Sequence, residues 1–259
     1  MKKVLFLGFM LLMSILLIAG CNGEEEEGID FSQLDGKTFA VPSGTVADEL
    51  VLSKFPNAEF KYYDNALDCC MAVKSGEVDA AAYDEPILKN IAAKNPGLKV
   101  LAEMITQDDY GFAVQLTDEE LKKVIDEVVS ELKADGTYED MVSRWLPEIG
   151  NPAPMPEIEL TGTKGTLKYG TAAITEPFSF IDESQKIVGF DIELAMYVAQ
   201  KLEMDLEIMD LDFGELIPEL MSGKVDMIGA CITITEERAQ SVLFSEPYYV
   251  GGIAALVRE

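Results

Sequence analysis

Lys74-Ser-Gly-Glu-Val-Asp79 runs directly into Ala-Ala-Ala-Tyr83, and Met221-Ser-Gly-Lys-Val-Asp226 runs in the same way into Met-Ile-Gly-Ala230. In both stretches a helical pattern ends at Ser-Gly, where glycine can adopt the left-handed conformation of a helix C-cap. An apolar run typical of a buried strand follows each glycine. The same helix-to-strand unit in both halves of the chain predicts two similar α/β lobes.

Short apolar runs and helical patterns alternate on both sides of these two stretches. Strands are predicted at 38–41, 59–63, 80–83, 98–102, 111–115, 167–171, 206–209, 227–230 and 253–257. Helices are predicted at 46–52, 66–74, 86–93, 118–134, 138–146, 215–221 and 236–242, and one more begins at 192. Thr117 and Asp191 are expected to cap the helices that follow them, and a hairpin is expected around 182–185. This alternation is typical of open parallel sheets, in which ligands bind beyond the carboxyl ends of the strands.

A proline-rich stretch divides the chain. Residues 147–156 contain four prolines and a glycine, which is too many for a helix or a central strand. We therefore predict a linker over residues 148–162.

The N-terminus has the composition of a secretion signal. Lys2 and Lys3 precede an apolar run from Val4 to Ala19, which is short for a transmembrane span. The run closes on Ile-Ala-Gly-Cys21 and resembles a bacterial lipoprotein signal, in which the cysteine is lipidated and becomes the new N-terminus. Residues 1–20 are thus predicted to be a signal peptide, and residues 21–28 an acidic tether; a plain transmembrane anchor is the alternative.

Composition excludes several classes of function. The formal net charge is −27, so the surface repels nucleic acid phosphates. The chain contains no histidine, which excludes Ser-His-Asp and Cys-His catalysis and removes the commonest zinc ligand. No metal site and no cofactor are predicted. Cys69, Cys70 and Cys231 show no metal-ligand spacing, and free buried thiols are favoured over a disulfide of Cys231.

Several motifs together resemble the bacterial solute-binding proteins of the polar amino acid family, which serve ABC importers. The motifs are Gly189-Phe-Asp-Ile-Glu-Leu194, Cys231-Ile-Thr-Ile-Thr-Glu-Glu-Arg238, Phe244-Ser-Glu-Pro-Tyr-Tyr249, Leu34-Asp-Gly-Lys-Thr-Phe-Ala-Val41 and Ala134-Asp-Gly-Thr-Tyr138. The resemblance covers residues 29–147 and 163–259. It implies a two-lobed periplasmic-binding-protein-like fold of type II.

The order of these segments differs from that of the family, in which the segment like 163–259 comes first. The resemblance thus predicts a circular permutant: lobe two at 29–104, a hinge crossing and the last segment of lobe one at 105–147, and the main part of lobe one at 163–259. Only the chain near 103–110 is then expected to join the lobes. A monomer is expected, and the alternative is a fragment whose lobes are completed by swapping with another copy.

The resemblance also implies a ligand site for an amino acid between the lobes. The matching residues are Arg238, Thr233, Cys231, Phe213, Thr175, Asp84, Thr45 and Val46. Arg238 would bind the ligand carboxylate with its planar fork, helped by Thr233, the Cys231 backbone, Thr45 and the Val46 amide. Its alternative role is a surface salt bridge to Glu236 or Glu237.

On the other lobe, Asp84 would bind the ligand ammonium; its alternative role is a helix N-cap. Phe213 would form an aromatic wall. Thr175 stands where the family often has Tyr or Phe, Ala172 replaces a frequent Asp, and Pro42 replaces a frequent Gln or Lys. The resemblance therefore leaves the identity of the amino acid open.

The predicted function is that of an extracytoplasmic lipoprotein, not an enzyme, that hands an amino acid to an ABC transporter permease. Two alternatives remain. A secreted lyase similar to cyclohexadienyl dehydratase would need a general acid or base, for which Glu176 is the candidate. A ligand-sensing module is the other.

Overall fold

The computed structural model describes residues 29–146 and 153–259. The predicted signal peptide, the acidic tether, Cys21 and the beginning of the proline-rich linker lie outside the described residues. Within the described part of the chain, no helix combines the length and the apolar character needed to cross a bilayer. The same residues contain no group of three or more potential protein ligands for a metal ion.

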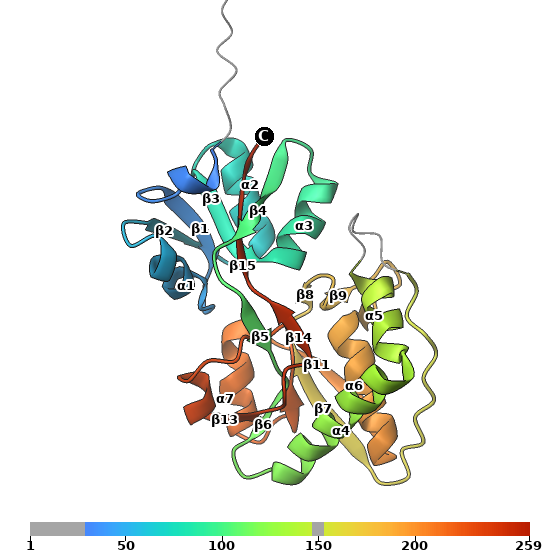
Figure 1. Ribbon diagram of the computed structural model, residues 1–259. Helices are drawn as coiled ribbons and strands as arrows, with labels where there is room; N and C mark the ends of the chain where they lie inside the picture. The colour runs from blue at the N-terminus through green and yellow to red at the C-terminus, as the bar shows by residue number, and fades with distance from the viewer. Residues whose placement is uncertain (1–28, 147–152) are drawn as a thin grey trace, which may run out of the picture.

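The chain forms two lobes, each built on a five-stranded sheet (Figure 1). Lobe two contains the sheet β2-β1-β3-β15-β4, and lobe one contains the sheet β11-β7-β12-β6-β13. Two short antiparallel strands, β5 (Asp108–Tyr110) and β14 (Tyr249–Gly251), lie between the lobes. We call β5 and β14 the crossing strands.

Lobe two is built from most of the first half of the chain and one strand from its C-terminal end. Its strands are β1 (Thr38–Pro42), β2 (Glu59–Tyr63), β3 (Ala80–Asp84), β4 (Leu98–Met104) and β15 (Ile253–Arg258). Its helices are η1 (Phe31–Gln33), α1 (Ala47–Lys54), α2 (Ala66–Ser75) and α3 (Glu85–Lys94). Strand β1 pairs in parallel with β2 and β3, whereas β15 is antiparallel to β3 and β4.

Lobe one combines segments from both sides of the linker. Its strands are β6 (Ala113–Gln115), β7 (Thr166–Thr171), β11 (Asp205–Asp210), β12 (Met227–Ile228) and β13 (Val242–Phe244). Its helices are α4 (Glu119–Asp135), α5 (Thr137–Trp145), α6 (Phe190–Leu202), α7 (Leu216–Met221), η2 (Phe213–Glu215) and η3 (Arg238–Gln240). A small sheet of β8 (Ile174–Thr175), β9 (Ser179–Ile181) and β10 (Ile187–Val188) adjoins α6.

The repeated Ser-Gly-x-Val-Asp stretch has the same structural role in both lobes. Gly76 and Gly223 adopt positive φ angles of 81° and 77° at the ends of α2 and α7. The aspartate that follows accepts a backbone N–H from the neighbouring parallel strand: Asp79 from Thr38 of β1 at 3.0 Å, and Asp226 from Lys168 of β7 at 2.8 Å. The prediction of two similar α/β lobes is confirmed, and the aspartates fix where β3 and β12 begin.

The strand predicted at 253–257 was assigned to the wrong lobe. Strand β15 lies between β3 and β4 of lobe two, and not in lobe one. Its residues Ile253 to Val257 are all buried, because an entirely apolar strand is stable only in the interior of a sheet. The chain therefore crosses between the lobes twice, after β4 and after β14, so the expectation of a single connection near 103–110 was also wrong (Figure 1).

Three local predictions were wrong as well. Residues 236–242 form the short 3-10 helix η3 and the start of β13, not an α-helix. Asp118, not Thr117, caps α4 by accepting the Leu121 N–H at 3.0 Å. Asp191 lies inside the first turn of α6, whose N-cap position is Gly189. In addition, both large sheets are mixed rather than parallel.

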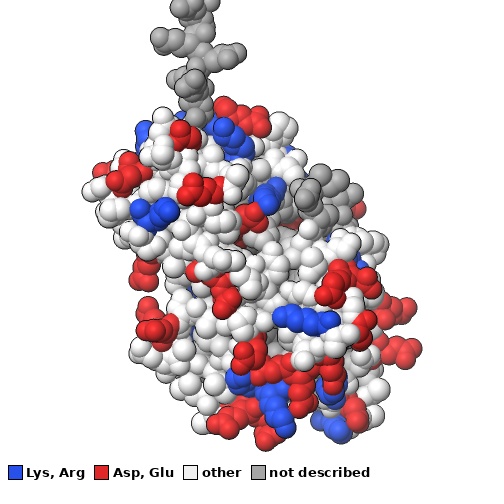
Figure 2. All heavy atoms as spheres, viewed as in Figure 1, with Lys and Arg blue, Asp and Glu red and all other residues white. Residues whose placement is uncertain are grey.

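Acidic side chains are distributed over both lobes on the face shown in Figure 2. Among the acidic side chains that form salt bridges in the described residues, Glu193 on α6 is the one that is fully buried. It accepts hydrogen bonds from Arg144 at 2.8 Å and from the Trp145 ring nitrogen at 2.5 Å. This network ties α5, which precedes the linker, to α6, which follows it.

Candidate functional site

The two lobes meet at the carboxyl ends of their strands. Asp84 is the last residue of β3 in lobe two, and Thr45 and Val46 immediately precede α1. In lobe one, Cys231 and Thr233 follow β12, while Phe213 and Arg238 begin η2 and η3. We call the space between these groups the interlobe site.

The lobes are in contact around this site. A Cβ atom added to Gly44 of lobe two would lie 3.5 Å from the Cα atom of Gly214 in lobe one. On another side, Lys94 Nζ of lobe two lies 2.7 Å from Glu176 Oε1 of lobe one. The structure therefore shows a closed arrangement in which the two halves of the site face one another.

Arg238 is a half-buried cation without an anionic partner among the described residues. Its Nη1 donates to the Thr233 carbonyl at 3.0 Å, and its guanidinium carbon lies 5.6 Å from the centre of the Phe213 ring. Burial lowers the pKa of Arg238 from its usual value, which is high enough that the group stays charged. The alternative salt bridge to Glu236 or Glu237 is not formed. The remaining guanidinium donors can therefore bind an anion.

Asp84 is buried and has no cationic partner within ion-pair distance in the described part of the chain. Its Oδ1 accepts the hydroxyl proton of Tyr110 on the crossing strand β5. Burial raises the pKa of Asp84 to about 7, and the hydrogen bond from Tyr110 acts in the opposite direction. Asp84 occupies the N-cap position of α3 but its side chain makes no capping bond there, so its alternative role is not seen.

Cys231 lies at a backbone turn that ordinarily favours glycine. Its φ angle is +46°, and its N–H donates to Asp191 Oδ2 at 2.8 Å. Burial raises the pKa of the Cys231 thiol well above its usual value, so this thiol stays protonated and is a poor nucleophile. Cys69 and Cys70 are also buried and free, as predicted.

Two of the three threonines predicted for the site, Thr45 and Thr175, already bind backbone atoms with their hydroxyl groups. The Thr45 hydroxyl donates to the Pro42 carbonyl at 2.9 Å and accepts the Ala47 N–H at 3.4 Å, which stabilises the start of α1. The Thr175 hydroxyl is buried and donates to the carbonyls of Ala172 and Ser179 at 3.2 and 3.3 Å. Thr175 therefore supplies wall surface rather than a free hydroxyl.

Two residues of the site region were missed by sequence reasoning. The sequence predicts only a crossing segment at Tyr110 and a helix cap at Asp191. Burial raises the pKa of Asp191 to about 7. Neither residue carries a local signal for its role, since each acts on a residue at least 26 positions away.

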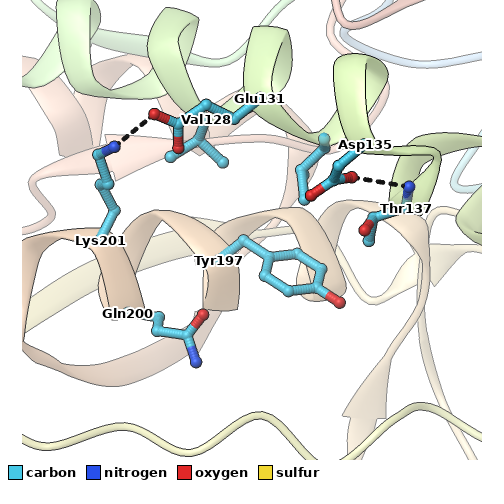
Figure 3. Close-up of a pocket in the computed structure, with 8 residues that line it drawn as sticks. Val128, Glu131, Asp135, Thr137, Tyr197, Gln200 and Lys201 are labelled. Carbon is cyan, nitrogen blue, oxygen red and sulfur yellow. Dashed lines mark hydrogen bonds and ion pairs between the residues drawn. The ribbon is translucent and has the colours of Figure 1, made fainter.

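Two further hollows are found on the described surface, and the second is lined in part by the interlobe pair Lys94 and Glu176. One is a groove between α4 and α6, in which Lys201 pairs with Glu131 at 2.6 Å and Asp135 accepts the Thr137 N–H at 2.9 Å (Figure 3). The other lies between residues 153–158 and the β9–β10 hairpin. Neither is lined by Asp84 or Arg238.

Comparison with known proteins relates the second half of the chain to one family. Residues 167–259 match the model of bacterial extracellular solute-binding proteins, family 3. A probable histidine-binding protein of Campylobacter jejuni is 45% identical over 85 residues, and the arginine-binding extracellular protein ArtP of Bacillus subtilis is 43% identical over 86 residues. Each match covers 33% of this chain and 33% of the relative, so the chain spans about a third of the length of these relatives.

Other similar proteins have related descriptions. The L-cystine-binding protein TcyJ of Escherichia coli is 32% identical over 96 residues, covering 37% of this chain and 36% of that protein. Among solved structures, an ancestral arginine-binding protein bound to arginine has 51% sequence identity and a TM-score of 0.33, with 33% of this chain and 38% of that chain covered.

Proposed function

We propose that the chain is a bacterial extracellular solute-binding protein of family 3, whose model matches residues 167–259, and that it binds an amino acid between its two lobes. It acts as a binding protein and not as an enzyme, in line with the relatives, which are named as binding proteins for histidine, arginine and cystine.

One observation carries the proposal. Asp84 and Arg238 come from different lobes, face the same site, and each lacks an oppositely charged protein partner within ion-pair distance among the described residues. The two charges still influence one another: Arg238 lowers the pKa of Asp84, and Asp84 raises that of Arg238. A buried charge without a partner costs free energy, so the site favours a ligand that supplies both an anion and a cation. The α-carboxylate and α-ammonium groups of an amino acid are such a pair.

The remaining site residues would support these two charges. The Thr233 carbonyl orients the Arg238 guanidinium, whose fork can pair with a carboxylate in a bidentate manner. The Val46 amide would donate to the same carboxylate, and Thr45 holds the loop before α1. The Cys231 N–H, which the resemblance assigned to the same end of the ligand, instead donates to Asp191 Oδ2 at 2.8 Å. Phe213 and Thr175 would contact the ligand side chain.

A lyase is the weaker candidate. Glu176 was the only general acid or base named for it, and the structure engages this carboxylate with Lys94 at 2.7 Å. The protonated Cys231 thiol offers no nucleophile in its place.

Localisation and chain order extend the proposal. The N-terminal sequence supports a lipoprotein whose Cys21 anchors it outside the cytoplasmic membrane, where it would deliver its ligand to an ABC transporter permease. The element order supports a circular permutation, because lobe two combines strands β1–β4 with the much later β15. One chain supplies the strands of both sheets, which supports a monomer.

A thermal-shift and calorimetry screen of the purified protein against the twenty L-amino acids tests the function. A ligand present at 100 times its Kd stabilises the fold by about 2.7 kcal/mol, so a binding amino acid should raise the Tm by several degrees. Prephenate turnover is the parallel assay for the lyase. Absence of a Tm shift with all twenty amino acids would overturn the proposed function.

A further inference from the structure

Tyr110 is the last residue of the crossing strand β5, and its hydroxyl joins three parts of the molecule. The hydroxyl donates to Asp84 Oδ1 of lobe two. It also accepts the N–H of Gly252 at 3.2 Å, and Gly252 lies in the second connection between the lobes, directly before β15. One phenol oxygen therefore contacts both interlobe connections and a carboxylate of the interlobe site.

The direction of these hydrogen bonds is determined by their chemistry. The Gly252 N–H can only donate, so the Tyr110 oxygen accepts there and directs its single proton to Asp84. Asp84 thus receives a donor on Oδ1, which favours its ionised form. Its second oxygen, Oδ2, makes no hydrogen bond within the described chain and is left for a ligand.

The ring of Tyr110 is held in place on several sides. A Cβ atom on Gly251 would lie 2.5 Å from the ring, so this crossing strand requires glycine for the close approach. The rings of Tyr249 and Phe178 lie 5.7 and 5.9 Å away. The Tyr110 backbone carbonyl also accepts the Tyr248 N–H at 3.0 Å, and the residue forms a β-bridge with Thr233 of the site. The phenol is therefore fixed relative to both crossing strands.

We propose that Tyr110 is a positioning residue that holds Asp84 in place for the ammonium group of the amino acid and links this carboxylate to the two crossing strands. The inference rests on the proposed function. Tyr110 acts through Asp84, because its hydroxyl proton is already used there.

A pH profile can separate this role from general structural support. The other titratable or charged groups around Asp84 are Asp108, Arg238, Tyr249, Cys231 and Tyr83. Burial and Asp108 raise the pKa of Asp84, whereas the Tyr110 hydroxyl and Arg238 lower it. Tyr110→Phe keeps the ring and removes the donor, so the pKa of Asp84 should rise further, and the cation-binding form should appear only at higher pH.

The experiment measures Kd by calorimetry from pH 5.5 to 8.5 for the unmodified protein, Tyr110→Phe, Asp84→Asn and Tyr249→Phe. The probe is whichever of the twenty screened L-amino acids binds the unmodified protein most tightly. Tyr249→Phe is the matched control, since its ring lies beside Tyr110 but its hydroxyl makes no hydrogen bond to the described residues.

We expect the affinity of the unmodified protein to fall below about pH 7, by up to about tenfold per pH unit. In Tyr110→Phe the midpoint of this fall should move up by at least half a pH unit, so its loss of affinity is greater at pH 6 than at pH 8.5. Tyr249→Phe should keep the original midpoint. A loss in Tyr110→Phe that is the same at every pH, or no loss, would overturn the inference alone. Normal binding by Asp84→Asn would instead overturn the site assignment of the proposed function.

Discussion

Lys94 Nζ, at the C-terminal end of α3 in lobe two, lies 2.7 Å from Glu176 Oε1 in lobe one. This ion pair connects the two lobes directly. Both side chains keep some exposure to solvent, at 48% and 28%, so the pair stabilises the closed state by no more than about 1 kcal/mol.

Lys94→Ala should therefore favour the open state slightly. We expect the affinity for the amino acid to fall about two- to fivefold, because closure loses up to about 1 kcal/mol. Small-angle scattering of the ligand-free protein should show a larger radius of gyration. Lys89→Ala is the control, since Lys89 pairs with Glu85 inside α3; equal effects of the two variants would contradict a role in closure.

Arg238→Ala should reduce amino-acid affinity by roughly 2–5 kcal/mol, because the ligand carboxylate would lose its charged partner. Arg238→Lys keeps the charge but not the planar fork, and should recover only part of the loss. Calorimetry measures both variants, and circular dichroism checks that the fold is retained. Near-normal affinity of Arg238→Ala would show that the carboxylate binds elsewhere.

Asp84→Asn should abolish binding and yet stabilise the ligand-free protein at pH 8. The pKa of Asp84 is about 7 in the folded state, against about 3.9 for an unfolded chain. Between these values the folded state holds a proton that the unfolded state has lost, so its stabilising effect is complete below about pH 4 and is lost as the pH rises through 7. The asparagine has no such dependence.

We therefore expect Asp84→Asn to be more stable than the unmodified protein by roughly 1–4 kcal/mol at pH 8, and the difference to shrink towards pH 4. Urea unfolding at several pH values measures it. Asp191→Asn serves for comparison, because burial also raises the pKa of Asp191 to about 7. If Asp84→Asn loses as much stability between pH 5 and pH 8 as the unmodified protein does, the pH dependence does not come from Asp84.

The free energy of unfolding of Cys231→Gly should exceed that of Cys231→Ala by about 1 kcal/mol, although a glycine ordinarily makes a protein less stable than an alanine at the same position. The φ angle of +46° places a Cβ atom in a strained position, and only glycine removes that strain. Ala230→Gly, one residue earlier at a buried position without a positive φ, should show the ordinary destabilisation. Chemical denaturation of the three variants tests the sign.

Cys21→Ser should block lipid attachment if the N-terminal sequence is a lipoprotein signal. The expected result is unprocessed precursor that no longer carries a lipid label. Normal cleavage together with normal detergent partitioning of this variant would exclude the lipid anchor. A secreted form that lacks the first 21 residues should still bind the amino acid, because the site lies in the two lobes.

Local sequence determined most of the helices and strands of this protein. The Ser-Gly ends of α2 and α7 predicted the left-handed turns at Gly76 and Gly223, since the required conformation is a property of glycine itself. The strand at 59–63 has the predicted bounds. The resemblance supplied Arg238 and Asp84, which lie near enough in the structure for each to shift the pKa of the other.

Tertiary structure alone decided which segments meet. The apolar pattern of β15 predicted a buried strand but not its neighbours. Every buried position in a sheet requires apolar side chains on both faces of the strand, so the pattern fits either lobe equally well. Its pairing with β3 joins residues separated by about 170 positions in the chain. Likewise, no pattern in the sequence predicts that Asp84 and Tyr110 are in contact. Their hydrogen bond forms because the two crossing strands and the end of β3 pack together between the lobes.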